Sequence, residues 1–314
     1  MRNRLERGAG SPAGPGTSSI DGLDERLIQF LQEDGRQTSE ALAKRLGVSP
    51  STVLNRMRRL LESRMMRIVA VVDPDRVGLL LAAVIGLDVD PGRLTPVVNA
   101  LAARQEVRFV SPCTGRYDIL VFALFRSSAE LSEFIERQVG GIEGVRDTET
   151  FICLRVTKGR FAQYTPLGDS LEERLIQHLQ RDGRQTSEAL AKKLKVSPST
   201  VLRRIRQLTE SGVVRIVAVV DLGVVGFPIV AVTGLDVEPG KLSRVVEALA
   251  ERPAVKFAST TTGRFDILAF MRFRSNEEFT AFMERELSAM EGIKDTETFI
   301  SLDVRKGRYT QNSL

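Results

Sequence analysis

The amino-acid sequence contains the same long segment twice, and this duplication constrains the fold more than any other feature. The segment that begins at Arg26 returns at Arg174 with few changes, an offset of 174 − 26 = 148 residues. The same offset relates Thr114-Gly-Arg-Tyr-Asp-Ile-Leu to Thr262-Gly-Arg-Phe-Asp-Ile-Leu. Solenoid repeats span only ~20–50 residues, whereas a period of this length holds one or two small domains. The sequence therefore predicts a covalent pair of units that each contain more than one domain.

The composition is typical of a globular chain. Apolar residues make up 42% of the 314 positions, and no run of eighteen apolar residues occurs. Residues 1–20 are rich in Arg, Gly, Pro and Ser, so we expect a disordered tail rather than a signal peptide, and a cytoplasmic location. The net charge of +5 permits a polyanionic partner but does not establish one.

The two cysteines do not indicate a metal or redox site. Cys113 and Cys153 are the whole thiol inventory, and their counterparts in the second copy are Thr261 and Ser301. A zinc site or a structural disulfide framework needs more ligands or partners than this. We expect two small core residues, no metal and no cofactor.

The first part of each copy predicts three short helices. In the first copy, residues 23–33 and 39–46 have apolar residues at helical spacing, and Gly35 and Gly47 mark the ends. Ser49 is a good N-cap for a third helix, and Pro50 suits its first position because a proline has no N–H to satisfy there. Two short helices joined by a tight glycine turn, the second with a basic outer face, are typical of a helix-turn-helix.

The second part of each copy predicts a β-rich domain. A linking strand over 68–72 is followed by strands over 79–89, 107–114, 118–126 and 145–156 and helices over 94–104 and 129–139. The order βαββαβ indicates the ferredoxin-like arrangement of an antiparallel sheet with two helices on one face. Cys113 and Cys153 would then lie on strands at opposite edges, too far apart to bond.

The fold class expected is α+β, with two copies of a winged-type helix-turn-helix followed by a ferredoxin-like domain. The expected boundaries place a tail at 1–20, helix-turn-helix domains at 21–66 and 169–214, sensor and oligomerisation domains at 67–160 and 215–314, and a linker at 161–168.

The third predicted helix of each copy carries a polar face that suits the major groove. Its apolar face comprises Val53, Leu54, Met57, Leu60 and Leu61. Arg binds guanine in a bidentate manner, and Asn or Gln binds adenine. The residues expected to contact DNA are Ser49, Ser51, Thr52, Asn55, Arg56 and Arg59, and in the second copy Ser197, Ser199, Thr200, Arg203, Arg204 and Gln207. Those expected to contact phosphates are Lys44, Arg45, Arg58 and Arg64, and Lys192, Lys193, Lys195 and Arg206.

The two reading faces are not identical. Asn55 aligns with Arg203, and Arg59 aligns with Gln207. These substitutions predict two unequal half-sites, so the preferred DNA would be an imperfect palindrome.

The motifs resemble those of the Lrp/AsnC, or feast/famine, family of regulators. The matching pieces, which recur in the second copy, are Leu23-Asp-Glu-Arg-Leu-Ile, Asp34-Gly-Arg, Val48-Ser-Pro-Ser-Thr-Val, the strand 67–73, Gly115-Arg-Tyr-Asp and Asp147-Thr-Glu-Thr. The resemblance implies a DNA-binding transcriptional regulator whose sensor domains pair through their sheets, bind an amino acid or related effector, and assemble into homo-oligomers. Most members carry one copy per chain, so the pairing could lie within this chain or between chains.

The resemblance places effector contacts near the loop between the second and third sheet strands. The candidates are Thr114, Gly115, Arg116, Tyr117 and Asp118, and Thr262, Gly263, Arg264, Phe265 and Asp266. A zwitterion needs a carboxylate for its ammonium group and a cation for its carboxylate. The alternative is a structural turn in which the glycines adopt positive φ and the aspartates brace the loop.

An enzyme on the same architecture is the competing interpretation. The two-domain pattern also resembles sirohaem decarboxylases, whose chemistry needs His or Arg beside the substrate carboxylates. The chain has one histidine, His178, in a predicted first helix, and no nucleophile–base pair or phosphate loop is evident. The sequence therefore favours a regulator over an enzyme.

Overall fold

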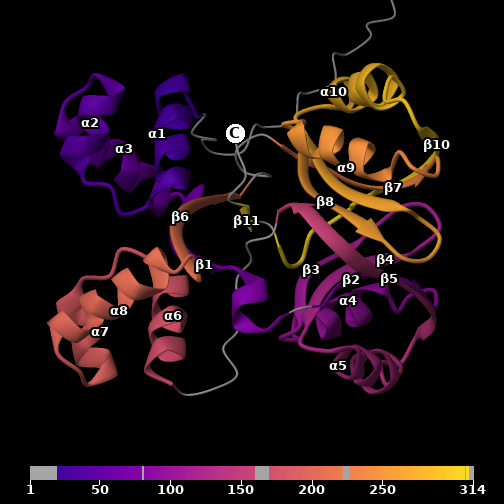
Figure 1. The fold of residues 1–314 in the computed structure, drawn as a ribbon, viewed down its shortest axis with the longest axis horizontal. Helices are drawn as coiled ribbons and strands as arrows, with labels where there is room; N and C mark the ends of the chain where they lie inside the picture. Colours follow the sequence, from indigo (N-terminus) through magenta and orange to yellow (C-terminus); the bar gives the residue numbers. More distant parts are fainter. Residues whose placement is uncertain (1–19, 80, 160–169, 222–226, 308, 311–314) are drawn as a thin grey trace, which may run out of the picture.

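The computed structural model describes residues 20–79, 81–159, 170–221, 227–307 and 309–310. Nearly all of the expected tail and all of the expected linker lie outside these residues. Figure 1 shows two lobes, one made of helices and one made of sheets and helices, with a short sheet between them. Of the helices that the structure describes, none combines the length and apolar character needed to span a bilayer.

The helical lobe holds both helix-turn-helix units (Figure 1). Its helices are α1 (Gly22–Glu33), α2 (Ser39–Leu46) and α3 (Pro50–Glu62), and α6 (Leu171–Arg181), α7 (Ser187–Leu194) and α8 (Pro198–Glu210). Thr38 caps α2 by accepting a hydrogen bond from the Ala41 amide, and Gly47 ends that helix with φ 71°. Ser49 caps α3, with Pro50 at its first position.

The apolar face predicted for α3 is narrower than the spacing indicated. Val53, Met57 and Leu60 are buried against α1 and α2, as expected. Leu54 and Leu61 are exposed, so their assignment to that face was wrong. The reason is geometric, because a short helix on one side of a three-helix unit can bury only a narrow stripe.

A short sheet joins the two copies within the chain. Strand β1 (Met66–Val72) pairs antiparallel with β6 (Val214–Asp221), and β11 (Tyr309–Thr310) extends β6. Helix α1 of the first copy packs on β6 of the second, and α6 packs on β1. The copies therefore exchange contacts inside one chain, which is one of the two pairings that the sequence leaves open. A 3₁₀ turn, η1 (Pro74–Val77), leads from β1 to the sensor domain.

Each sensor domain has the predicted βαββαβ order. The first comprises β2 (Leu81–Val89), α4 (Leu94–Ala102), β3 (Val107–Pro112), β4 (Ile119–Phe125), α5 (Ser128–Glu133) with the π-helical turn η2 (Phe134–Val139), and β5 (Val145–Lys158). The second comprises β7 (Ile229–Val237), α9 (Leu242–Glu251), β8 (Val255–Thr261), β9 (Ile267–Phe273), α10 (Asn276–Ala281) with η3 (Phe282–Leu287), and β10 (Ile293–Ile300). The ferredoxin-like prediction is confirmed.

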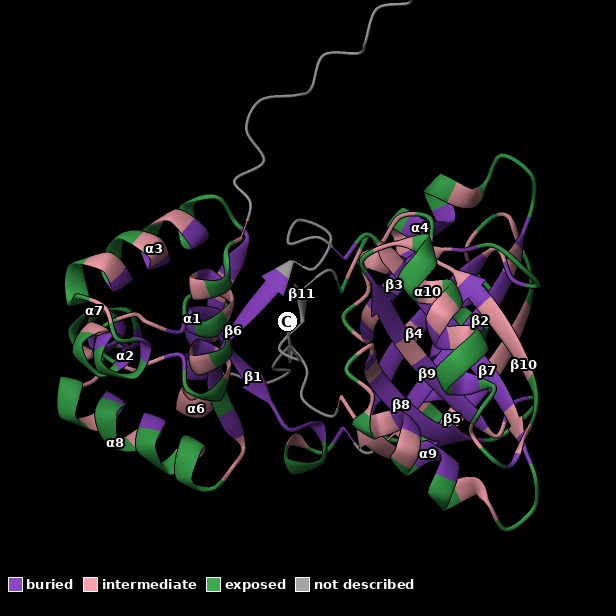
Figure 2. Cartoon of the chain, turned by 90° about the horizontal axis from the view of Figure 1, so that it is seen from above, coloured by how far each residue is buried: buried purple, intermediate pink, exposed green. Residues whose placement is uncertain are grey.

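The two sensor sheets join edge to edge and also face each other. Pairing of β5 with β8 gives the described strands the order β10-β7-β9-β8-β5-β2-β4-β3. Strands β3 and β5 lie at opposite edges of the first half, and Cys113 and Cys153 are both free and buried, as predicted. Rings from the two halves pack together, with centroids 5.0 Å apart for Phe122 and Phe257. The outer faces carry the helices (Figure 2).

Candidate nucleic-acid interface and sensor loops

The start of each third helix is organised by its N-cap serine. The Ser49 hydroxyl accepts a hydrogen bond from the Thr52 amide at 3.1 Å and lies 2.8 Å from the hydroxyls of Ser51 and Thr52. Ser197 makes the same arrangement at the start of α8. The caps thus fix the helix ends that would enter the groove, because they satisfy amides that otherwise have no partner.

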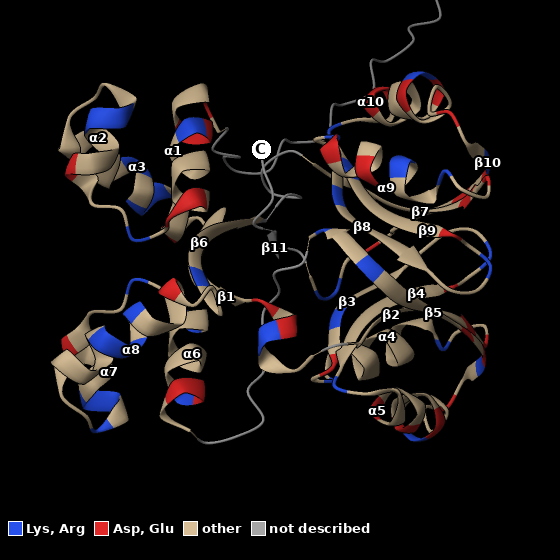
Figure 3. Ribbon diagram, in the orientation of Figure 1, with Lys and Arg blue, Asp and Glu red and all other residues tan. Residues whose placement is uncertain are grey.

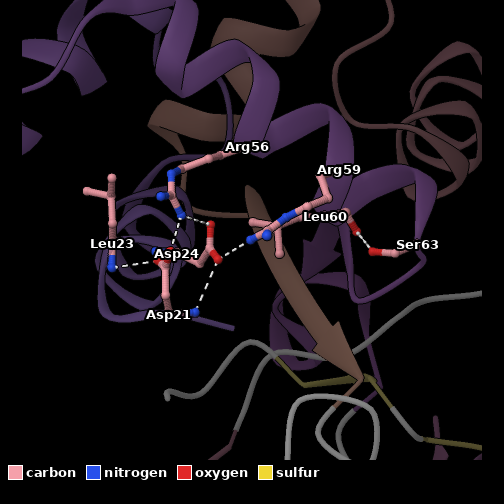
Figure 4. A network of polar contacts seen from close by, with 7 residues as sticks. All are labelled: Asp21, Leu23, Asp24, Arg56, Arg59, Leu60 and Ser63. Atoms are coloured by element: carbon pink, nitrogen blue, oxygen red, sulfur yellow. Dashed lines mark hydrogen bonds and ion pairs between the residues drawn. The ribbon is translucent and has the colours of Figure 1, made fainter. Parts of the chain in front are cut away.

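Arg56 and Arg59 are bound to the first helix of their own unit. Figure 4 shows Arg56 between Asp21 and Asp24, with Nη1 at 2.6 Å from Asp21 Oδ2 and at 2.9 Å from Asp24 Oδ1. Arg59 pairs with the other oxygen of Asp24, a residue that is 0% exposed. The hydrogen bond from Arg56 lowers the pKa of Asp21 to about 2. These arginines lie on the predicted face, but part of their hydrogen-bonding capacity serves the three-helix unit.

In the second copy, Arg204 is the counterpart of Arg56 and has weaker contacts with its own unit. Glu172 takes the place of Asp24 and lies 3.2 Å from Arg204 Nε. Gln207, which replaces Arg59, accepts a hydrogen bond from Arg204 Nη1 at 3.1 Å. The two reading faces therefore differ in how their side chains are restrained as well as in sequence.

Exposed side chains complete the face that points away from each unit. Asn55 and Arg203 are exposed, as predicted for residues that contact bases. Leu54 and Leu202 lie beside them and are 49% and 52% exposed. Helical spacing does not indicate these leucines as surface residues, because it places Leu54 on the apolar face of α3. The signal that could have found them is the recurrence of an apolar residue directly before a polar reading residue in both copies.

The residues expected at phosphates divide into two kinds. Lys44, Arg58, Lys192 and Arg206 are exposed, and Lys and Arg positions occur along the helices of both helix-turn-helix units (Figure 3). Arg45 instead pairs with Glu33 at 2.8 Å and stacks 3.7 Å above the ring of Phe30. The exposed cations remain well placed for phosphate oxygens, whereas Arg45 is held by its own domain.

The sensor loops clamp the last strand of the opposite copy. The Thr114 amide donates to the Ile300 carbonyl at 3.0 Å, and the Ile300 amide donates back to the Thr114 hydroxyl. Thr262 and Ile152 repeat this exchange. Gly115 has φ 106°, which a residue with a Cβ rarely adopts.

The aspartates of these loops brace the turn. Asp118 Oδ2 accepts from the Val89 amide at 2.8 Å, and Asp266 Oδ2 accepts from the Val237 amide at 2.8 Å. This geometry matches the structural-turn alternative. It leaves one oxygen of each carboxylate for other interactions.

The loop arginines of both copies converge on one carboxylate. Arg116 Nε lies 3.5 Å from Glu297 Oε1, and Arg264 Nε lies 3.4 Å from Glu297 Oε2. The equivalent Glu149 instead accepts a hydrogen bond from the Tyr117 hydroxyl, and burial raises the pKa of that phenol above its usual value. Phe265 has no hydroxyl to do the same. Sequence reasoning missed both glutamates, although they occupy the same place in the repeated Asp-Thr-Glu-Thr motif.

Two linked helix-turn-helix units and two paired ferredoxin-like domains define the architecture of a DNA-binding protein. Comparison with known families agrees with this. Residues 82–162 and 230–310 match the Lrp/AsnC ligand binding domain, 20–61 the AsnC-type helix-turn-helix domain, and 169–215 a winged helix-turn-helix DNA-binding domain. The ligand-binding matches cover more than half of the 314 residues. The chain belongs to the Lrp/AsnC family and is a DNA-binding transcriptional regulator that carries both domains twice.

The lengths of similar proteins agree with the duplication. An uncharacterized HTH-type transcriptional regulator of Pyrococcus furiosus is 38% identical over 145 residues, which is 46% of this chain and 98% of that protein. The HTH-type transcriptional regulator FL11 of Pyrococcus furiosus is 36% identical over 140 residues, 44% of this chain and 92% of its own. Each relative therefore corresponds in length to about one copy.

Solved structures also resemble nearly the whole chain. The siroheme decarboxylase NirDL superposes with a TM-score of 0.63 at 21% identity, over 91% of this chain and 92% of that one. At this identity the likeness shows a shared fold. His178 lies on α6 in the helix-turn-helix lobe, and burial is the main cause that lowers its pKa.

Proposed function

We propose that one chain acts as a complete dimer-like regulator and binds an imperfectly palindromic DNA site with α3 and α8. The observation that carries this proposal is the pairing of β1 with β6, which runs from Met66 opposite Val220 to Val72 opposite Val214. This pairing fixes two reading helices relative to one another without a second chain. Dimeric helix-turn-helix proteins bind half-sites whose spacing follows the spacing of their recognition helices.

The proposed contacts combine base readout with positioning. Asn55 and Arg203 read base edges, and Leu54 and Leu202 contact thymine methyl groups. Some hydrogen-bond donors that do not bind intramolecular partners remain available for DNA. They belong to Arg56, Arg59, Arg204 and Gln207. The hydroxyls of Ser49, Ser51, Thr52, Ser197, Ser199 and Thr200 contact the backbone around the helix ends.

The test is genome-wide DNA capture followed by hydroxyl-radical footprinting on the strongest site. Asn55→Ala should weaken protection of one half-site, and Arg203→Ala should weaken protection of the other. Each loss should be about 1–3 kcal/mol. Gln138→Ala, on the π-helical turn of the sensor domain, is the control and should leave the footprint unchanged. A strictly symmetric site with equal losses for both variants would contradict unequal readout.

An amino acid or related small molecule is proposed as the effector. The loops at 114–118 and 262–266 support this, because their two arginines both contact Glu297 of β10 and their aspartates lie in the same turns. A ligand carboxylate could replace Glu297 between Arg116 and Arg264. Titration calorimetry of the protein and of Glu297→Gln with each amino acid would measure this, and an unchanged affinity in the variant would argue against it.

We infer a regulator rather than an enzyme. The regulator relatives support this, and the single histidine lies in the DNA-binding lobe, away from the sensor sheets. The discriminating experiment compares a gel shift on the protein's own upstream DNA with the absorption spectrum after incubation with a tetrapyrrole. Tight tetrapyrrole binding without a gel shift would favour the decarboxylase alternative.

Further assembly of chains through the sensor domains is also proposed. Leu154 and Leu302, at equivalent positions after the 148-residue offset, are 64% and 63% exposed, the highest values among the exposed large apolar side chains that the structure describes. Light scattering on the purified protein and on the Leu154→Ser, Leu302→Ser variant would show whether these residues support assembly.

A further inference from the structure

Asp24 is a buried carboxylate that connects the first helix of its unit to the reading helix α3. It is 0% exposed, although carboxylates are seldom fully buried unless they are paired. Its Oδ1 accepts from Arg56 Nη1 at 2.9 Å, and its Oδ2 accepts from Arg59 Nη2 and from the Asp21 amide (Figure 4). Because a buried carboxylate is stable only with such partners, Asp24 and the two arginines hold each other in position.

The contacts of Arg56 leave one edge of its guanidinium group for another partner. Both carboxylates that it binds, those of Asp21 and Asp24, lie at Nη1, at distances of 2.6 and 2.9 Å. The other nitrogens, Nε and Nη2, form the opposite edge, and within the described part of the chain that edge binds no partner. Two adjacent donors of this kind match the O6 and N7 acceptors of guanine.

Arg59 shares the same carboxylate but has less to offer to a base. Its Nη2 is bound to Asp24, and its Nε is buried and has no hydrogen-bond partner among the described residues. The edge formed by Nε and Nη2 of Arg59 therefore faces the protein. The contribution of Arg59 is a second positive charge that stabilises the buried Asp24 beside Arg56.

The second copy arranges the equivalent side chains differently. Glu172 takes the place of Asp24, and its side chain is 38% exposed. Its Oε1 lies 3.2 Å from Arg204 Nε, a nitrogen that is buried, and Arg204 Nη1 donates to Gln207. Each edge of Arg204 thus includes a nitrogen that faces its own unit, so a contact through two donors requires Arg204 to leave a partner.

We propose that Asp24 is a positioning residue, which fixes Arg56 for a two-donor contact with one guanine and makes the half-site of α3 the more strictly specified of the two. Arg204 contacts the half-site of α8 with single donors, and that half-site tolerates a change of base at this point. A guanidinium that is held in place before binding loses less side-chain freedom on association. This inference rests on the proposed binding mode and adds which half-site tolerates change.

Competition gel shifts with 7-deazaguanine test the two-donor contact. This base pairs with cytosine but lacks the N7 acceptor in the major groove. All guanines of one half-site are replaced, and the footprints of Asn55→Ala and Arg203→Ala assign the half-sites to α3 and α8. The penalty is the Kd for the substituted operator divided by the Kd for the unsubstituted one, both at the same salt concentration.

Matched lysine variants identify which arginine causes the penalty. Arg56→Lys keeps a cation beside Asp21 and Asp24 but cannot make the planar two-donor contact. In the half-site of α3, we expect this variant to reduce the wild-type penalty about fivefold or more. Arg204→Lys should change the penalty in the half-site of α8 by less than about twofold. Equal changes in the two half-sites would overturn the inference.

Asp24→Asn tests the positioning role itself. It removes the charge that holds Arg56, so the penalty in the half-site of α3 should fall toward that of Arg56→Lys, whereas Glu172→Gln should leave the penalty in the half-site of α8 unchanged. Asp24→Glu installs the side chain that the second copy accommodates and should act in the same direction if Asp24→Asn does not fold. A merely structural role would weaken binding to both DNAs by one factor and leave the penalty unchanged, which would overturn the inference.

The outcomes separate this inference from the proposed function. If the wild type protects an imperfect palindrome but both Asp24 variants keep the wild-type penalty, the positioning role fails and the proposed binding mode stands. If the wild type shows no preference for any captured site over a mixed-sequence duplex, the proposed binding mode fails, and this inference fails with it.

Discussion

Arg36 and Arg184 bind each other's helix-turn-helix unit through reciprocal hydrogen bonds. Arg36 donates from Nε to the carbonyl of Gly183 at 2.8 Å and from Nη2 to that of Gln185 at 3.0 Å. Arg184 donates in return to the carbonyl of Gly35 at 3.2 Å and to the carbonyl of Gln37 at 3.3 Å. These bonds cross the junction where α1 packs on β6 and α6 on β1, so they fix the angle between the two reading units.

Replacement of both arginines should loosen the alignment of the two units, which the pairing of β1 with β6 still holds together. Arg36→Ala with Arg184→Ala removes four hydrogen bonds from charged donors, and we expect the free energy of unfolding to fall by about 2–4 kcal/mol. Affinity for a full two-half-site operator should fall about tenfold or more, because the half-sites are then engaged less cooperatively. Gel shifts on full and single half-site duplexes measure this. Arg137→Ala, at an exposed sensor-domain ion pair, is the control. Equal losses on both duplexes would argue against a role in alignment.

The ion pair of Asp21 should make the first unit sensitive to acid. The hydrogen bond from Arg56 holds the pKa of Asp21 at about 2, below its ordinary value of 3.8. The stabilisation is therefore present above the ordinary value and is lost as the pH falls through the folded value. Asp21→Asn keeps an N-cap acceptor but removes the charge. The thermal midpoint of the wild type should approach that of the variant between about pH 5 and pH 2. A constant difference over this range would contradict the assignment.

The ends of α2 and α7 offer a matched stability test. Gly47 ends α2 with φ 71°, and Lys195 ends α7 with φ 58°. A residue with a Cβ in the left-handed region is strained, whereas glycine is not. Lys195→Gly should raise the free energy of unfolding by about 0.5–1 kcal/mol, and Gly47→Lys should lower it by a similar amount. Urea unfolding measures both, and a destabilised Lys195→Gly variant would contradict the strain argument.

The helices and strands within one copy were predictable because their signals are local. Ser49 with Pro50 marks the start of α3, and a run of β-branched residues before Asp73-Pro74 marks β1. The exchange between copies was not predictable from these patterns, since the pairing of β5 with β8 depends on which surfaces meet in three dimensions. The same applies to Arg36, whose partners lie about 150 residues away in the sequence.

Spacing along a helix predicts which face a candidate DNA contact lies on, but not which residues it binds. The helical period assigns Arg56 and Arg59 to the face opposite the core, whereas in the structure both are partly buried beside α1. Their attachment to Asp24 depends on the N-terminus of α1 lying beside α3, a tertiary contact that no local pattern encodes.

The exposed leucines of the reading helices give the most direct test of base contact. Leu54 and Leu202 precede Asn55 and Arg203, and a leucine side chain at the groove can pack against the C5-methyl of thymine. Replacing thymine by deoxyuridine throughout the operator removes these methyl groups and leaves the hydrogen-bonding edges intact. We expect this DNA to bind the wild type about 1 kcal/mol more weakly, because the apolar contact is lost.

The same change should have little effect on a variant that lacks the leucines. Leu54→Ala with Leu202→Ala should bind thymine DNA more weakly than the wild type and should barely distinguish it from deoxyuridine DNA. Coupling between the protein and DNA changes, measured by competition gel shifts at fixed salt, isolates the contact from general stability effects. Additive losses would mean that the leucines face away from the bases, and the reading surface would then reduce to its polar residues.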